Sequence, residues 1–257
     1  MIKNFIVDRV VRGNMYSHKN GQLLWSLNQI QNPSLSMESE SVDAVDALGT
    51  PIMTFDRSKT CTFSAENAFF DLGLLAEQAG TAVAHGNTIS PAFETLDVVE
   101  GKVTLSNEPH KDYPVTYVYV MKNDGSLGEE YRLTAEGVTE DKAFSISGKE
   151  ITLPNGSKAE RVFVSYDYET EATYMDNSAK NFPKAGKFVM EVLGRDVCDS
   201  TTEIFAYLVL HNAKLSASTE ITFDTEMTQG FELIAQQDYC SKDNLLFSLI
   251  IPCDCEE

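Results

Sequence analysis

Histidine and cysteine are the side chains through which this chain could carry out nucleophilic or acid–base chemistry. The four histidines are His18, His85, His110 and His211. None of them has a serine, cysteine or aspartate at a spacing typical of a catalytic triad, although triads are spatial rather than sequential. The sequence also lacks a G-x-S-x-G elbow, an H-E-x-x-H helix, a Walker loop and a G-x-G-x-x-G turn. We therefore expect no catalytic residues and a protein that is not an enzyme.

The cysteines favour free thiols over a metal centre. Cys253-x-Cys255, with Cys240 earlier in the chain, could offer three thiolates to zinc. Zinc sites usually use C-x-x-C spacing, so free thiols are the preferred interpretation and a zinc site is the alternative. The sequence contains five scattered cysteines and no signal-peptide pattern, which is typical of reduced thiols in a cytosolic compartment. We expect no metal and no cofactor.

Three carboxylates alternate along the chain in the way that calcium ligands sometimes do: Asp167, Glu169 and Glu171. A calcium loop also needs a turn glycine and a closing glutamate at a fixed distance, and Ala172 and Thr173 follow instead. Side chains two residues apart lie on the same face of a β-strand. The pattern therefore indicates a solvated strand edge.

Composition indicates a folded protein with a strongly acidic surface. The chain has 257 residues, of which 42% are hydrophobic and 10% aromatic, so it can bury a sizeable core. Its 39 acidic and 20 basic residues give a net charge of −19. Such a surface repels phosphate and disfavours nucleic-acid binding by counterion release, but it would suit the wall of a conduit through which DNA slides. No apolar segment is long enough to span a membrane, so we expect no membrane partner.

Residues 34–80 have the clearest local pattern. Residues 34–40 and 60–66 alternate with a period of two, which predicts two half-buried strands. The segment between them, 42–50, is small and acidic and predicts a loop. Residues 68–78 then follow helical spacing, and Gly80 stands where a helix C-cap would. A long hairpin followed by a packed helix suits assembly, because an exposed β-ribbon needs a partner.

The loop of this hairpin has two interpretations. In one it is only a solvated hairpin tip. In the other it is an assembly loop that reaches a neighbouring subunit and becomes ordered on contact. We take the assembly loop as the candidate site, with these residues: Asp43, Val45, Asp46, Leu48 and Gly49.

Strand and turn signals along the rest of the chain predict a mainly β protein. Candidate strands are 5–11, 23–30, 102–105, 115–121, 130–133, 143–147, 150–153, 161–168, 187–193, 203–210, 220–228, 230–236 and 245–251. Residues 1–88 and 170–257 are expected to form one discontinuous β-domain. Residues 91–169 have the short strands and polar turns of an immunoglobulin-like sandwich inserted into it, after a linker at 87–90. The strand at 203–210 is expected to be buried on both faces.

The middle segment also offers tyrosines that could recognise a ligand. Tyr117, Tyr119, Tyr166 and Tyr168 could form an exposed aromatic platform that binds a carbohydrate or a protein. At a period of two, however, such residues more often pack on one face of a strand. Both interpretations stay open.

Two parts of the chain, about half of it, resemble tail tube proteins of long-tailed bacteriophages in pattern and order. The matching segments are Glu38-Ser39-Glu40, Asp46-Ala47-Leu48-Gly49-Thr50-Pro51-Ile52 with Phe55, the helix 69–79, Ala213-Lys214-Leu215-Ser216, Gln229-Gly230-Phe231-Glu232, and Tyr239-Cys240-Ser241 leading to 246–252. The middle sandwich is not part of the minimal tube fold.

The resemblance implies a tail-tube-type β-barrel or sandwich with one packed helix. It further implies homo-hexameric rings that stack into a tube, with the hairpin around 42–51 reaching the adjacent ring. The partners would be further copies of the chain and other tail proteins, and DNA would pass through the tube without specific binding. The location would be the virion tail, assembled in the host cytoplasm.

Other functions remain as alternatives. One is another virion protein on a related fold, such as a tail terminator, a baseplate hub or a head decoration protein. The second is a β-sandwich module that binds carbohydrate or protein. The third is an enzyme, for which the sequence offers no constellation of nucleophile, base or metal.

Overall fold

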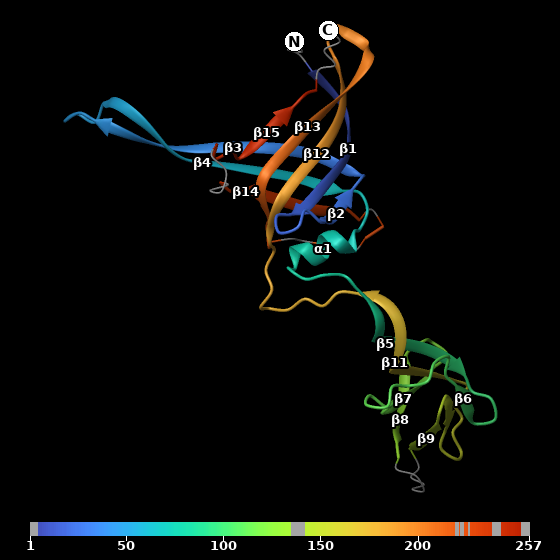
Figure 1. Ribbon diagram of the computed structural model, residues 1–257. Coiled ribbons are helices and arrows are strands. Elements are labelled where there is room, and N and C mark those ends of the chain that lie inside the picture. The colour runs from blue at the N-terminus through green and yellow to red at the C-terminus, as the bar shows by residue number, and fades with distance from the viewer. Residues whose placement is uncertain are drawn as a thin grey trace. The chain divides into compact units, whose positions relative to one another are not determined.

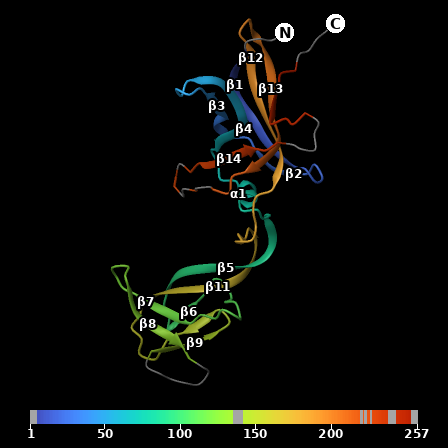
Figure 2. The same ribbon diagram turned by 90° about the vertical axis from the view of Figure 1, so that its left-hand side faces the viewer.

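The chain is mainly β, as predicted, and it forms two compact units. A computed structural model describes residues 5–134, 142–218, 221, 224–225, 227–237 and 243–252, with fifteen strands and one helix among them. Met1–Val83 and Met175–Glu257 form one unit, called the split unit below, and Ala84–Tyr174 form the middle unit. Figures 1 and 2 show the strands of each.

One curled antiparallel sheet makes up the split unit. Its strand order is β2-β1-β12-β13-β14-β4-β3, and β15 pairs with β13 beside β14. The strands are β1 (Phe5–Ser17), β2 (Leu23–Leu27), β3 (Ile30–Val45), β4 (Pro51–Asn67), β12 (Ala185–Asp196), β13 (Asp199–Leu215), β14 (Gln229–Ala235) and β15 (Phe247–Ile250). Strands β12, β13 and β14 of the C-terminal part lie between the N-terminal pairs β2-β1 and β4-β3, so neither part can complete the sheet alone.

An aromatic cluster forms the core of the split unit. Trp25, Phe63, Phe188 and Phe231 are all buried, and the ring centroids of neighbouring pairs lie 5.3–6.5 Å apart. Such tilted and edge-on contacts add to the energy of area burial. Gly13 lets β1 approach this cluster, because a Cβ there would lie 2.6 Å from Ile30 Cδ1 and 3.1 Å from Phe188.

The helix α1 (Leu72–Gln78) is shorter than the predicted 68–78. It begins after Asp71, whose side chain caps it by accepting a hydrogen bond from Leu74 N at 2.7 Å. Residues before this cap are held out of the helix, since Asn67 Nδ2 donates to Phe69 O at 2.6 Å. The predicted role of Gly80 is confirmed, because it follows the cap residue Ala79 with φ +70°.

Two buried glutamines fix α1 against β14. Gln229, which is fully buried, accepts a hydrogen bond from Asp71 N through Oε1 at 2.8 Å. Gln78 donates from Nε2 to Gly230 O at 3.1 Å. Hydrogen bonds set position as well as energy, because a slipped helix would leave buried polar groups unpaired. The helix is therefore held in one place on the sheet.

The middle unit has its own sheet and its own core. The strand order is β5-β11-β7-β8-β9-β10-β6, antiparallel throughout except for the parallel pair β8 and β9. The strands are β5 (Ala84–Asp97), β6 (Lys102–Thr104), β7 (Tyr117–Met121), β8 (Leu127–Leu133), β9 (Ala143–Ser147), β10 (Glu150–Thr152) and β11 (Arg161–Tyr174). Its relation to immunoglobulin-like sandwiches stays a prediction.

Three sequence predictions differ from the structure. The linker predicted at 87–90 is wrong, because these residues pair with β11 as part of β5. Pro91 is accommodated there because β5 is an edge strand, where its missing N–H breaks no ladder. The strand at 203–210 is not buried on both faces, since Phe205 is 44% exposed. In the strand predicted at 220–228, residues 220, 222, 223 and 226 lie outside the described residues, and the others form no strand, although Ile221 makes an isolated bridge to Gln229.

The glutamine anchor of α1 can be tested by substitution. Gln229→Ala removes the acceptor of Asp71 N and leaves a buried donor unpaired, so we expect the free energy of unfolding to fall by about 1–3 kcal/mol. Urea unfolding of the whole chain measures this. Gln31→Ala, at an exposed position of β3, is the matched control and should change it by less than about 0.5 kcal/mol. Equal losses in the two variants would contradict the anchor.

Candidate assembly surfaces

Residues 38–60 form a two-stranded ribbon, called the arm below, that extends from the sheet of the split unit (Figure 1). β14 pairs with β4 only from Cys61 to Asn67, whereas β3 pairs with β4 over the whole length of the hairpin. In the arm, β3 and β4 therefore have only each other as ladder partners among the described residues. The loop predicted at 42–50 is wrong in extent, because strand pairing continues to Val45 and resumes at Pro51.

A β-bulge decides which side chains share a face of the arm. Ser39 pairs with Lys59 and Glu40 pairs with Arg57, so Ser58 is an extra residue with φ +23°. Such an insertion reverses the alternation along one strand. Odd-numbered residues of β4 that follow Ser58 in the sequence, such as Cys61 and Phe63, point into the core. Those that precede it, such as Phe55 and Met53, lie on the opposite face.

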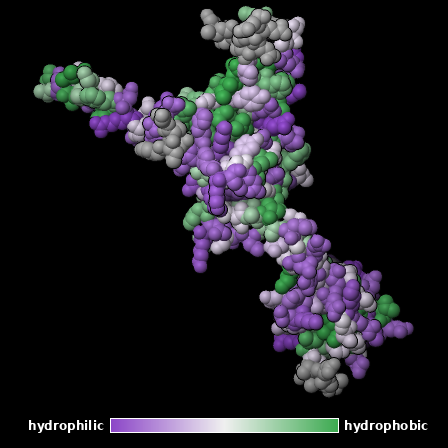
Figure 3. Space-filling view, in the orientation of Figure 1, coloured by the Kyte–Doolittle hydropathy of each residue, from purple (hydrophilic) through white to green (hydrophobic). Residues whose placement is uncertain are grey.

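One face of the arm is apolar and exposed as a result. The cross-strand pairs on this face are Val42 with Phe55 and Ala44 with Met53. Val42, Met53 and Phe55 are 47%, 56% and 48% exposed, although each is a side chain that is usually buried. We call these four residues the apolar face of the arm. In Figure 3 the hydrophobic colour gathers near the end of the arm.

The opposite face of the arm is polar. Asp43 pairs with Thr54 and Ser41 pairs with Asp56. Thr54 donates a hydrogen bond to Asp43 Oδ1 at 2.6 Å, which ties the two strands together on this side. The arm is therefore amphipathic.

The tip of the arm is a hydrogen-bonded turn, and whether it becomes ordered on contact with a neighbouring subunit stays a prediction. Asp46 Oδ1 accepts hydrogen bonds from Leu48 N at 2.9 Å and Thr50 N at 2.8 Å. These bonds, that of Thr50 first, lower the pKa of the Asp46 carboxyl below its usual value. Gly49 takes φ +84°, which a side chain would disfavour, and the turn presents Leu48 with 91% of its surface exposed.

The five residues predicted from the loop therefore have different positions. Asp46, Leu48 and Gly49 lie together in the turn, Val45 ends β3 next to it, and Asp43 lies on the polar face. Whether they contact a neighbouring subunit stays a prediction. Sequence reasoning missed Val42, Met53 and Phe55, although the alternation in each strand was the signal that could have found them.

A second surface covers the side of β14, β4 and β3 that faces away from the core. The inward face of these strands carries Phe63, Ala65, Phe231 and Leu233, so the residues between them point outward. The polar outward residues, called the acidic wall below, are Ser34, Ser36, Glu38, Thr60, Thr62, Ser64, Glu66 and Glu232, and β14 adds Gly230 and the 42% exposed Ile234 between them. The side chains of the acidic wall are hydroxyls and carboxylates without a lysine or arginine. The next strand, β13, adds Lys214 opposite Ile234 at the margin.

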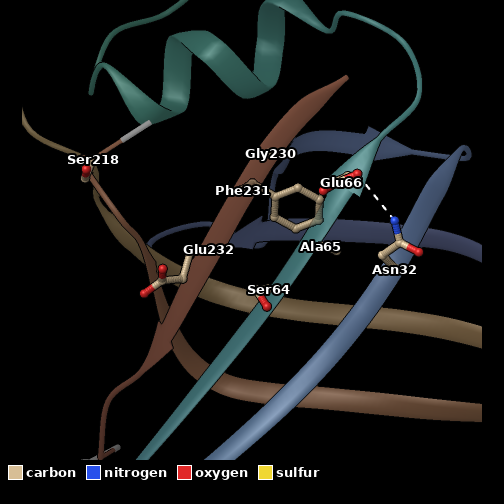
Figure 4. A pocket seen from close by; sticks show the side chains of 8 residues that line it. All are labelled: Asn32, Ser64, Ala65, Glu66, Ser218, Gly230, Phe231 and Glu232. Atoms are coloured by element: carbon tan, nitrogen blue, oxygen red, sulfur yellow. Dashed lines mark hydrogen bonds between the residues drawn. The ribbon is translucent and has the colours of Figure 1, made fainter. Parts of the chain in front are cut away.

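A shallow cavity of about 320 Å³ lies on the acidic wall (Figure 4). Glu66 and Glu232 lie on neighbouring strands there, where Glu66 pairs with Gly230 and Ser64 pairs with Glu232. Asn32 Nδ2 donates to Glu66 Oε2 at 3.4 Å. Because two carboxylates and no ammonium line this hollow, it would repel a polyanion.

Among the described residues, no group of histidine, cysteine or carboxylate side chains could hold a metal ion. Cys61 lies in the core, where burial raises the pKa of its thiol, and Cys198 is exposed. Cys240, Cys253 and Cys255 lie outside the described residues, so the zinc alternative is not tested.

The histidines also have separate surroundings. His211 Nε2 lies 2.8 Å from Ser248 Oγ, and His85 Nδ1 lies 3.0 Å from Thr173 Oγ1. His18 Nε2 lies 3.3 Å from Asn212 Oδ1. His85 Nε2 also lies 3.5 Å from Glu171 Oε1, so a carboxylate, an imidazole and a hydroxyl are neighbours there, but the His85 and Glu171 side chains are 68% and 71% exposed on the open surface of β5 and β11.

The four tyrosines do not form one platform. Tyr166 is buried in the core of the middle unit, and Tyr168 packs against that core but is only partly buried. Tyr117 and Tyr119 lie on its outer face, with ring centroids 6.4 Å apart, and the Arg132 guanidinium lies 5.6 Å from the Tyr117 ring. The packing interpretation is therefore confirmed for the pair in β11.

The hydrogen bonds of Asp46 make the order of the tip depend on pH. Because folding lowers its pKa below 3.8, the turn is stabilised above that pH and loses this support as the pH falls through the folded-state pKa. We expect the amides of Leu48 and Thr50 to exchange faster with solvent in this acidic window. Asp46→Ala should show fast exchange at neutral pH, whereas Asp56→Ala, outside the turn, should not. Slow exchange in Asp46→Ala would contradict this role.

No helix in the described part of the chain is long and apolar enough to cross a membrane.

Comparison with known proteins gives the family. No curated protein matches the sequence. The model of the YomU/Tube protein family matches residues 4–242, which is nearly the whole chain. The chain therefore belongs to the YomU/Tube protein family, a family of phage tail tube type.

Proposed function

We propose that this chain is the structural subunit of a phage tail tube, in which copies form hexameric rings that stack into a conduit for DNA ejection. Its partners are then other copies of itself and other tail proteins, and its location is the virion tail, after assembly in the host cytoplasm. Family membership supports a tail tube protein in general. The observation that carries the finer proposal is the amphipathic arm, which has no partner within the described chain.

The arm supplies the contact between rings in this proposal. Val42, Met53 and Phe55 expose apolar surface in the single chain, and fully burying one such side chain contributes about 1.5–3 kcal/mol. The formed turn holds Leu48 outward, so little conformational entropy is lost when the tip docks. β3 is also an edge strand whose free backbone groups a neighbouring strand could pair.

In this proposal the acidic wall lines the lumen of the tube. A ring closed by rotation places the same face of every subunit around the axis, so the charges of Glu38, Glu66 and Glu232 are repeated around it. DNA carries one negative charge per about 1.7 Å of helix axis, and a wall without cations gives it no counterion to displace. The DNA would then slide through the tube and would not bind to its wall. We assign neither stacking nor the lumen to the middle unit, which stays a proposed immunoglobulin-like insertion.

The arm can be tested by removing apolar surface from one face. The triple variant Val42→Thr, Met53→Thr and Phe55→Thr keeps strand propensity, and we expect folded subunits that no longer stack. Negative-stain electron microscopy and sedimentation velocity at rising concentration measure assembly, and circular dichroism checks the fold. The control is Ser41→Ala with Asp56→Asn on the polar face, which should still assemble.

Deleting residues 42–49 should have the same effect as the triple variant. Normal tubes from either variant would overturn the role of the arm. Rings of the wild-type chain that never lengthen under any condition would favour a tail terminator instead.

The lumen assignment predicts a gain of DNA binding. Ser64→Lys, Glu66→Lys and Glu232→Lys together should make assembled tubes retain short duplex DNA, with an affinity that falls as salt rises. The control carries the same change of charge on the middle unit: Thr95→Lys, Asp97→Lys and Glu160→Lys, all at exposed positions. Gel retardation and electron microscopy of the complexes measure retention. Equal retention by the two variants would contradict the lumen assignment.

A further inference from the structure

A groove of about 610 Å³ in the middle unit has the features of a ligand site. Its size lies within the range typical of small-molecule sites. The segment 107–112 forms one side, Lys149 contributes from the turn between β9 and β10, and Tyr168 and Glu169 contribute from β11. The lining residues are Asn107, Glu108, Pro109, His110, Lys111, Asp112, Lys149, Tyr168 and Glu169.

A hydrogen-bond network beneath the groove holds the start of this segment in place. Tyr166 donates from its hydroxyl to Glu94 Oε1 at 2.5 Å and accepts from Asn107 N at 3.0 Å. Glu94 Oε2 in turn accepts from Ser106 N and Ser106 Oγ, both at 3.1 Å. Burial and then the bond to Glu94 raise the pKa of Tyr166, so its hydroxyl keeps its proton at neutral pH. Lys149 Nζ donates to Ser106 O at 2.7 Å from the other side.

The segment is also fixed around His110. Its backbone N donates to Asp167 O at 2.7 Å, and its Nδ1 accepts from Asp112 N at 3.2 Å. A neutral imidazole with an accepting Nδ1 carries its proton on Nε2, which is then a donor. The ring packs 5.5 Å from that of Tyr113. A ligand would therefore meet a preformed surface and pay little to order it.

The lining chemistry favours a ligand that both donates and accepts hydrogen bonds. Asn107, His110 and Lys111 offer donors, whereas Glu108, Asp112 and Glu169 offer acceptors. The lining has three carboxylates and only two ammonium groups, those of Lys111 and Lys149. The resulting net negative charge disfavours phosphate and other anions. Few apolar side chains line the groove, which disfavours an apolar peptide. Tyr168 and Pro109 supply the apolar surface on which the C–H face of a sugar ring can rest.

We propose that this groove binds a neutral saccharide, with Tyr168 beneath the sugar ring and His110, Asp112 and Glu169 bonding its hydroxyls. A hydroxyl is both donor and acceptor, so it matches a lining of mixed type better than a charged or apolar ligand does. The proposal uses only residues of the middle unit, and it does not depend on whether the chain forms a tube.

Titration of the whole chain with cellotetraose, maltotetraose and chitotetraose tests the proposal, with isothermal calorimetry and amide chemical shifts as readouts. We expect saturable binding of at least one of them, with shifts confined to the segment 107–112, Lys149 and the end of β11. Glu169→Gln and His110→Ala should each weaken it about tenfold, since the first replaces a charged acceptor by a weaker neutral one and the second removes a hydrogen-bond partner of the ligand. Glu160→Gln, an exposed glutamate of the same unit outside the groove, should leave it unchanged.

Three results would overturn the proposal. The first is the absence of saturable binding for all three oligosaccharides. The second is binding that neither Glu169→Gln nor His110→Ala weakens. The third is tighter binding of inorganic phosphate than of any sugar, which would make the groove an anion site. Amide spectra of both variants establish that the middle unit remains folded. A negative result for saccharide binding would not bear on the tube proposal, which uses other residues.

Discussion

The pairing of β14 with β4 is the constraint on which the split unit depends. It joins the C-terminal part of the chain to the hairpin of the N-terminal part, and it places Phe63 and Phe231 in one aromatic cluster. It also brings Gln229 under α1, so the helix is fixed by the same strand. Where this pairing stops, at Cys61, the core stops and the arm begins. A single ladder therefore separates the part of β4 that stabilises the unit from the part that remains free to bind.

The bulge at Ser58 gives the two parts of β4 different chemistry. Without it, Phe55 and Met53 would continue the inward face of Cys61 and Phe63, opposite to Val42 and Ala44, and neither face of the arm would be uniformly apolar. With it, the apolar residues share a face with Glu38 and the acidic wall. The ribbon twists along its length, as β-ribbons do, so the two surfaces need not point the same way in space (Figure 1). Ser58 Oγ donates to Glu40 Oε2 at 2.9 Å and supports the bulge.

This bulge also explains how far the sequence predicted the structure. Period-two alternation located strands wherever one face meets a core, as at Cys61, Phe63 and Ala65, and the helix signal at Gly80 was correct. The same rule began β4 too late, at residue 60 and not at Pro51, because alternation breaks at an inserted residue and the arm has no core to set its phase. The hydrogen-bond network around Glu94 could not be predicted from the sequence either. Tyr166 reaches Glu94 only when β5 and β11 pair, and Ser106 is bound by the same carboxylate. Local pattern predicts elements, whereas sites depend on contacts distant in sequence.

An exposed apolar ribbon with a free edge is normally an aggregation hazard, and in the proposed tube the charge of the chain would oppose premature association of single subunits. Glu38, Glu40, Asp43 and Asp56 lie along the arm, on a chain whose net charge is −19. Repulsion between such surfaces acts over about 8–10 Å at physiological salt, whereas apolar burial acts only at contact. Two chains therefore repel until an arm meets a surface that matches its apolar face. In the proposed tube, the same carboxylates that keep DNA moving would thus also keep subunits from joining in the wrong register.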